Sequence, residues 1–121
     1  MIRLAILVSY GGEGVKVCQD CAECSGILYV GIGDSGLVEE AEFFQIGGGC
    51  SGEVLEFVRE LEVDIVVGAL APSVAEMLIE EEVAVMTPSF TDPKDLIRAY
   101  VSGELADPLA EAGFWLSRPN N

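Results

Sequence analysis

The order of short apolar runs along this chain restricts the folds that it can adopt. Runs of strand length come first, and stretches with helical spacing of apolar residues then alternate with further short runs. The expected elements are strands at 2–8, 26–32 and 38–46, a helix at 52–61, a strand at 63–68, a helix from Pro72, a strand at 83–86 and a helix from Thr91 to Gly103. Residues 9–24 are expected to form a long loop, and Asp92 is expected to cap the last helix.

This order predicts an α/β fold. The first three strands have tight connections, which favour antiparallel pairing, whereas a strand–helix–strand crossover gives parallel pairing. The 121 residues fit one domain with a single core. We therefore expect a mixed five-stranded sheet, with three antiparallel strands followed by parallel β/α units and with helices on its faces.

Cysteines are the most distinctive chemical feature of the chain. Cys18, Cys21 and Cys24 recur at three-residue spacing, Cys50 stands in a glycine tract, and there is no histidine. Thiolates are soft ligands for iron, zinc, copper and metal–sulfur clusters, and the lack of imidazole excludes a histidine-based catalytic triad. The triplet is similar to part of an iron–sulfur ligand run, and it also fits a four-thiolate zinc site if Cys50 completes it. Metal or cluster ligation is favoured, with redox or adventitious thiols as the alternative.

The apolar runs are too short for a signal peptide or a membrane span. We therefore expect a cytoplasmic protein that does not act at a membrane. In that compartment its cysteines would be reduced, and a disulfide pair is the alternative.

Acidic residues dominate the charge of the chain, whose net charge is −15. Residues 39–82 hold twelve acidic residues and one basic residue. Nucleic acid is a poor partner for such a chain, because binding it relies on Lys and Arg. The acidic stretch indicates solvated helix faces that keep the protein soluble, and the alternative is a surface for a basic partner.

Two glycine-rich segments have possible binding roles. Residues 31–36 match the dinucleotide fingerprint by letter, but no helical stripe follows them, so a hairpin turn is the better interpretation. Residues 47–52 precede a helix, and bare backbone N–H groups there would favour an anion. A flexible connection explains the second segment equally well.

Taken together, these segments resemble the dinitrogenase iron–molybdenum cofactor-binding family. This family includes the NifX-type cofactor carriers, the C-terminal part of NifB proteins and the small molybdenum–copper orange protein. The best marker is the strand 63–68 leading through a small-residue turn to Pro72, and the strand 83–86 with the helix after it also matches. The resemblance covers residues 1–105 as a cofactor-binding-like domain and leaves 106–121 as a C-terminal tail.

The resemblance implies a ribonuclease H-like fold and a non-catalytic role. That role is to bind or carry a metal–sulfur cofactor of iron–sulfur or iron–molybdenum type, as in nitrogenase cofactor biosynthesis, with cofactor-donor and acceptor proteins as partners. Many members carry a His-Phe-Gly-Arg-type loop where this chain has residues 20–23, so thiolates would replace a histidine ligand.

In this interpretation thiolates ligate the metal and backbone N–H groups hold the anionic sulfide shell. The candidate metal ligands are Cys18, Cys21, Cys24 and Cys50, and the candidate cofactor-binding residues are Gly11, Gly12, Gly48, Gly49, Ser51 and Pro72. Two other functions stay open from the residues alone. One is a structural zinc site in an interaction module, and the other is a thiol redox sensor.

Overall fold

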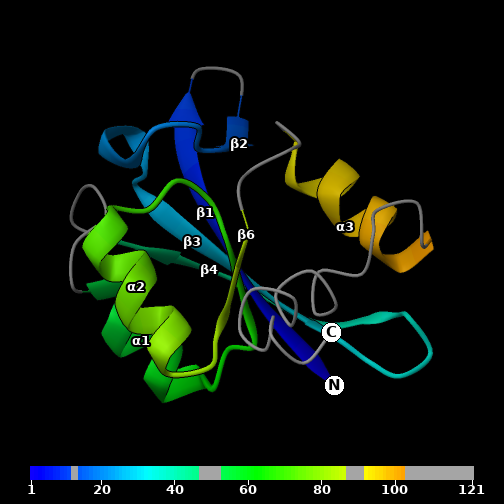
Figure 1. Cartoon of the computed structure of the whole chain (residues 1–121). Coiled ribbons are helices and arrows are strands. Elements are labelled where there is room, and N and C mark those ends of the chain that lie inside the picture. The colour runs from blue at the N-terminus through cyan, green and yellow to red at the C-terminus, as the bar shows by residue number, and fades with distance from the viewer. Residues whose placement is uncertain (12–13, 47–52, 87–91, 103–121) are drawn as a thin grey trace.

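The computed structural model describes residues 1–11, 14–46, 53–86 and 92–102. Its elements are β1 (Ile2–Gly11), β2 (Gly14–Val17), the 3-10 turn η1 (Cys21–Glu23), β3 (Gly26–Ile32), β4 (Val38–Gln45), α1 (Glu53–Leu61), β5 (Ile65–Val67), α2 (Pro72–Glu80), β6 (Ala84–Met86) and α3 (Pro93–Ser102) (Figure 1). The predicted tail at 106–121 lies outside the described residues. Among the described helices, none has the length and apolar composition needed to span a bilayer.

A single mixed sheet organises the described residues. Its strand order is β4-β3-β1-β5-β6, and β2 pairs with β1 beside this path. β3 is antiparallel to both β1 and β4, whereas β5 is parallel to both β1 and β6. The expected α/β class and the change from antiparallel to parallel pairing are therefore confirmed. The sheet has six strands rather than the expected five.

The additional strand corrects our expectation of a loop over residues 9–24. β1 continues to Gly11, and β2 returns beside it, with Val8 opposite Val17 and Gly11 opposite Gly14. The physical reason is the short alternation of β-branched Val15 and Val17 around a lysine, which suits a pleated strand but is too brief to stand out in the sequence.

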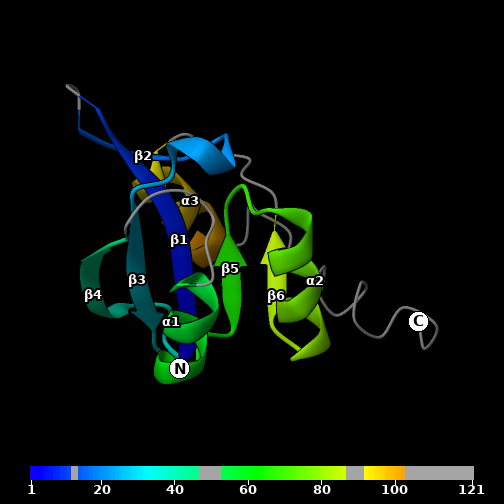
Figure 2. The same cartoon turned by 90° about the vertical axis from the view of Figure 1, so that its left-hand side faces the viewer.

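Helices cover both faces of the sheet. Figure 1 shows α1 and α2 in green on one side and α3 in yellow to orange on the other, and Figure 2 shows the same layers from a second direction. Leu7 of β1 faces the α1 and α2 side with Val58 and Leu78, while its neighbour Ile6 faces the α3 side with Leu96. Each of these fully buried side chains contributes at most about 1.5–3 kcal/mol through removal from water.

The carboxylates of Asp64 and Asp92 and the turn at residues 31–36 each make hydrogen bonds that join or cap elements of the fold. Asp64 joins β1 to the start of β5, because its carboxylate accepts the N–H of Arg3 at 2.9 Å and its own N–H donates to the Arg3 carbonyl at 2.9 Å. The expected cap at Asp92 is confirmed, since its carboxylate accepts the N–H of Lys94 at 2.8 Å. Residues 31–36 lead into a hairpin between β3 and β4, and the predicted turn is therefore confirmed.

Candidate functional site

The cysteine-bearing segment lies between β2 and β3 and is held against β1 at both ends. The N–H of Cys18 donates to the carbonyl of Leu7 at 3.0 Å, and the N–H of Ser25 donates to the carbonyl of Val8 at 2.9 Å. Between these two bonds the chain makes the turn η1, where the carboxylate of Asp20 accepts the N–H of Ala22 at 3.0 Å. The segment is thus anchored to adjacent residues of one central strand.

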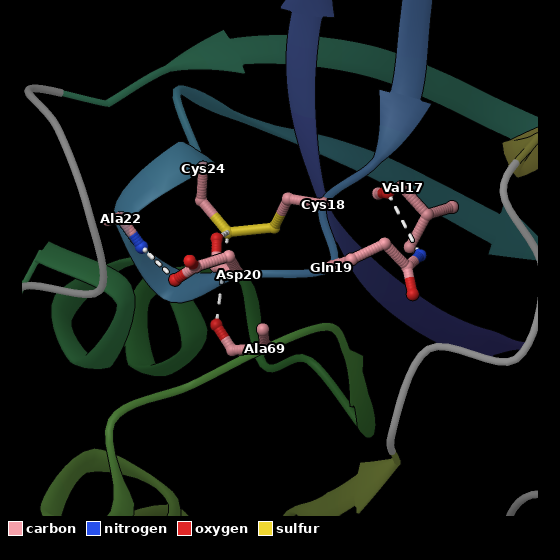
Figure 3. The surroundings of a disulfide bond; sticks show 7 residues. All are labelled: Val17, Cys18, Gln19, Asp20, Ala22, Cys24 and Ala69. Carbon is pink, nitrogen blue, oxygen red and sulfur yellow. Dashed lines mark hydrogen bonds between the residues drawn. A yellow bond between two sulfur atoms is a disulfide. The ribbon is translucent and has the colours of Figure 1, made fainter.

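A disulfide joins Cys18 to Cys24 across this segment (Figure 3). Both side chains are buried in the core below α1 and α2. Cys21 also takes part in a disulfide, and the described part of the chain contains no free cysteine. We expected reduced cysteines, and this expectation is corrected here. The turn η1 folds the segment back so that the Cα atoms of Cys18 and Cys24 are 5.4 Å apart, a separation that a disulfide spans.

The disulfide determines what these sulfur atoms can do. A sulfur bonded to another sulfur is not a thiolate, and thiolate is the form that ligates metals and attacks electrophiles. Two electrons and two protons would convert the Cys18–Cys24 bond into two thiols. Within the described ranges, no group of three or more Cys, Asp or Glu side chains is arranged to hold a metal ion. Thiolate ligation by this segment therefore requires the reduced protein.

The same segment contacts the turn that follows β5. The Sγ atom of Cys24 lies 3.6 Å from the carbonyl oxygen of Asp20 and 3.8 Å from that of Ala69 (Figure 3). A disulfide sulfur carries no hydrogen, so these are S···O contacts rather than hydrogen bonds. The thiol of a reduced Cys24, which is a weak donor, would have both carbonyl oxygens within reach as hydrogen-bond acceptors. The contact places Cys24, a candidate metal ligand, beside the turn that leads to Pro72, a candidate cofactor-binding residue.

The turn after β5 leads directly into a helix N-terminus. Gly68 starts it with φ +149°, and Pro72 occupies the first turn of α2, where it is exposed. Ala71 stands at the N-cap position and provides no side-chain hydrogen bond to the helix. Since the N-terminal end of a helix carries partial positive charge, this end of α2 favours an anionic group.

The other predicted site residues are only partly placed by the structure. Gly11 is the last residue of β1 and pairs with Gly14, so it belongs to a strand rather than to the expected loop. The remaining predicted residues lie outside the described residues, namely Gly12, Gly48, Gly49, Cys50 and Ser51. Ligation by Cys18, Cys21, Cys24 and Cys50 therefore stays a prediction.

A hollow lies on the α3 side of the sheet, away from the cysteine segment, and no sequence pattern predicted it. Its volume is about 580 Å³, and it is lined by Gly14, Val15, Leu28, Phe43, Asp92, Pro93 and Lys94. These residues come from three strands and one helix, so no local motif marks them. The alternation within 14–17 is the one signal that could have indicated part of its wall.

Comparison with known proteins shows which class of fold this is. No known family model matches the chain, and no curated protein matches it in sequence. Among solved structures, it is similar to PH0822 at a TM-score of 0.70 and 18% identity, over 84% of this chain and 90% of that chain. It is also similar to a candidate dinitrogenase from Methanocaldococcus jannaschii (MJ0327), with a TM-score of 0.66, 14% identity and coverage of 87% and 92%.

A third similar structure is a candidate NifB protein from Thermotoga (TM1290) assigned to the DUF35 family. Its TM-score is 0.64 at 16% identity, over 85% of this chain and 90% of that chain. At such identities the likeness shows a shared mixed α/β fold across nearly the whole of each chain. Two of these three structures have names connected with nitrogenase.

Proposed function

We propose that this chain binds or carries a metal–sulfur cofactor of iron–sulfur or iron–molybdenum type when its cysteines are reduced. The observation that carries this proposal is the contact between Cys24 and Ala69, which brings the cysteine segment beside the turn that precedes α2. The names of two similar structures, a candidate dinitrogenase and a candidate NifB protein, support the same theme. The strand order also supports a ribonuclease H-like fold.

The proposed division of labour follows from the chemistry of the groups. Reduced Cys18, Cys21 and Cys24 would supply thiolates to the metal, and Cys50 is the fourth candidate. The uncapped N-terminus of α2 would favour the negative charge of a sulfide-containing cofactor. Binding and delivery need no general acid or base, so the proposal assigns no catalytic residue. It implies a reducing compartment such as the cytoplasm, with donor and acceptor proteins as partners.

Anaerobic reconstitution tests this function. The protein is reduced with a dithiol, supplied either with ferrous iron and sulfide or with zinc, desalted, and analysed for iron, sulfide, zinc and visible absorption. We expect a coloured species in the wild-type protein and its loss in a variant with Cys18→Ser, Cys21→Ser and Cys24→Ser. The variant Cys50→Ser, made separately, measures the contribution of the fourth cysteine. A reduced wild-type protein that stays colourless and retains no iron contradicts the proposal, and one that retains a single zinc ion favours the zinc-binding interaction module.

The Cys18–Cys24 disulfide supports a second candidate function, that of a thiol redox sensor. In this function a cellular dithiol opens the bond by thiol–disulfide exchange. The dithiol is oxidised to its own disulfide, and two thiols remain on the protein. Equilibration in glutathione buffers followed by alkylation of free thiols tests it without any metal. Reversible opening of the Cys18–Cys24 bond within the range of cellular reduction potentials supports the sensor function. A bond that stays closed throughout that range contradicts it.

A further inference from the structure

The strand β4 forms one edge of the sheet. It is 8 residues long and, within the described part of the chain, pairs only with β3. Most of its side chains are exposed, from Val38 to Glu42. The residue before it, Leu37, is 68% exposed, and Val38 is 47% exposed. A long exposed edge presents backbone donors and acceptors that can pair with another strand.

The register shows which backbone groups point outward. Just beyond β4, the N–H of Ile46 donates to the carbonyl of Ser25 at 3.1 Å, toward β3. In an antiparallel ladder successive residues alternate between bonding to the neighbouring strand and pointing away from it. Glu42 lies an even number of residues before Ile46 in the regular register, so its N–H and carbonyl point toward β3. The N–H and carbonyl of its neighbour Ala41 therefore point away from β3. Ala41 therefore marks the middle of the outward-facing edge.

The charge of this edge disfavours a second copy of the same chain as its occupant. Three exposed glutamates, Glu39, Glu40 and Glu42, lie on β4, and the strand has no basic residue. In an antiparallel pairing of two β4 strands centred on Ala41, Glu40 of each copy would stand opposite Glu42 of the other. Like charges directly opposite one another are destabilising in a sheet. A strand with basic side chains at alternating positions would instead meet opposite charges.

We propose that the β4 edge binds, by strand addition, an extended segment of a partner protein that carries basic residues at alternating positions. Main-chain hydrogen bonds to the outward groups around Ala41 would supply affinity. Ion pairs with Glu40 and Glu42 would orient the segment and select it over neutral strands. Leu37 and Val38 offer apolar contact at the start of the strand. This proposal does not depend on the cofactor-binding function.

A synthetic probe tests the proposal on the full-length protein. The probe is a peptide of alternating Lys and Val, as long as β4, and the control is the same peptide N-methylated on every backbone nitrogen, so that charge is kept but neither edge can donate hydrogen bonds to a strand. We expect the N-methylated peptide to bind at least about tenfold more weakly, as measured by calorimetry. We also expect the unmodified peptide to slow hydrogen exchange of the Ala41 amide by at least about tenfold.

Matched variants separate backbone pairing from charge. Ala41→Pro removes the outward N–H without removing a bond to β3, a substitution that edge strands accept, whereas Ala41→Val keeps the N–H. Binding should fall at least about tenfold in the proline variant and stay within about twofold in the valine variant. Glu40→Gln with Glu42→Gln should weaken binding and reduce its salt dependence.

Four results would overturn the proposal. They are equal binding of the N-methylated peptide, wild-type affinity in a folded Ala41→Pro variant, dimerisation through β4, and an Ala41 amide that is already protected in the peptide-free protein. If Ala41→Pro does not fold, as judged by its thermal melt, the N-methylated peptide decides the question alone.

Discussion

The Sγ atom of Cys24 lies 3.8 Å from the carbonyl oxygen of Ala69, 45 residues further along the chain. This contact joins the segment between β2 and β3 to the turn between β5 and α2. Two stretches with separate local patterns thereby become one candidate site. Because of this contact, the cysteines contribute to packing in addition to being candidate ligands. Their removal should therefore affect both stability and binding.

Removing the Cys18–Cys24 disulfide should destabilise the protein under non-reducing conditions. The bond closes a loop with a sequence separation of 6, and the chain-entropy relation gives about 2 kcal/mol for a loop of this size. We expect the double variant Cys18→Ala/Cys24→Ala to lose about that much in free energy of unfolding, measured with urea. Gln19→Ala, in the same segment and exposed, should change it by less than about 0.5 kcal/mol. Equal stability of the double variant and the wild-type protein would show that the bond does not stabilise the fold.

Gly68→Ala should destabilise the turn that contacts Cys24. Gly68 has φ +149°, and an added methyl carbon would lie 2.6 Å from Cβ of Leu7. Gly14→Ala is the matched control, because Gly14 has φ +110° but no atom lies within 4 Å of the added carbon. We expect a loss of about 1 kcal/mol at Gly14 from backbone strain alone, and about 2 kcal/mol or more beyond that at Gly68 from overlap. Denaturant unfolding measures both, and similar losses at the two positions would mean that the Leu7 overlap relaxes at little cost.

Asp64→Ala should loosen the attachment of β5 to β1. The variant leaves the N–H of Arg3 without the carboxylate that accepts it at 2.9 Å, at a cost of about 1–3 kcal/mol. Asp64→Asn keeps an acceptor oxygen at the same position and should lose less. Urea unfolding at neutral pH measures both variants. The interpretation fails if the alanine variant is as stable as the wild-type protein.

Tyr29 should make stability fall at alkaline pH. Burial raises the pKa of Tyr29 above its ordinary value of 10.0, the hydrogen bond from its hydroxyl to Glu40 at 3.1 Å raises it further, and Arg3 acts in the opposite direction. The folded protein therefore holds this proton more tightly than the unfolded chain does. Its contribution is complete below the unfolded pKa near 10 and is lost as pH rises through the higher folded pKa.

The variant Tyr29→Phe isolates this contribution, because the other two tyrosines titrate in both proteins. Between about pH 9 and about pH 11, the free energy of unfolding should fall more steeply in the wild-type protein than in the variant. Urea unfolding at several pH values measures the two slopes. Parallel slopes would show that Tyr29 ionises equally easily in the folded and unfolded states.

Much of the fold could be predicted from local pattern. The strand Gly26–Ile32 has the predicted bounds, and the helix from Pro72 was expected from a proline at its first turn and an apolar stripe. Within that stripe Val74 and Leu78 are buried, as helical periodicity requires. Strand β2 was missed, because four residues give too little alternation to separate a strand from a loop.

The candidate site was predictable in part. The resemblance made Cys24 a candidate ligand and Pro72 a candidate cofactor-binding residue, and the structure brings the segments that hold them into contact through Cys24 and Ala69, while their binding of a cofactor stays a prediction. The sequence did not indicate that Cys18 bonds to Cys24. Equal spacing of Cys18, Cys21 and Cys24 does not distinguish one pairing from another, so the bond depends on how η1 folds the segment back.

By itself, then, the amino-acid sequence determined the kind and order of the main elements, because periodicity and turn chemistry act within a few neighbouring residues. Only the tertiary structure decided which sulfur atoms form a disulfide, that Cys24 lies against Ala69, and that the backbone N–H and carbonyl of Ala41 point outward from an edge strand. These features depend on the register and packing of segments far apart in the chain. Proximity of that kind is a property of the whole folded core and has no local signature in the residues that it joins.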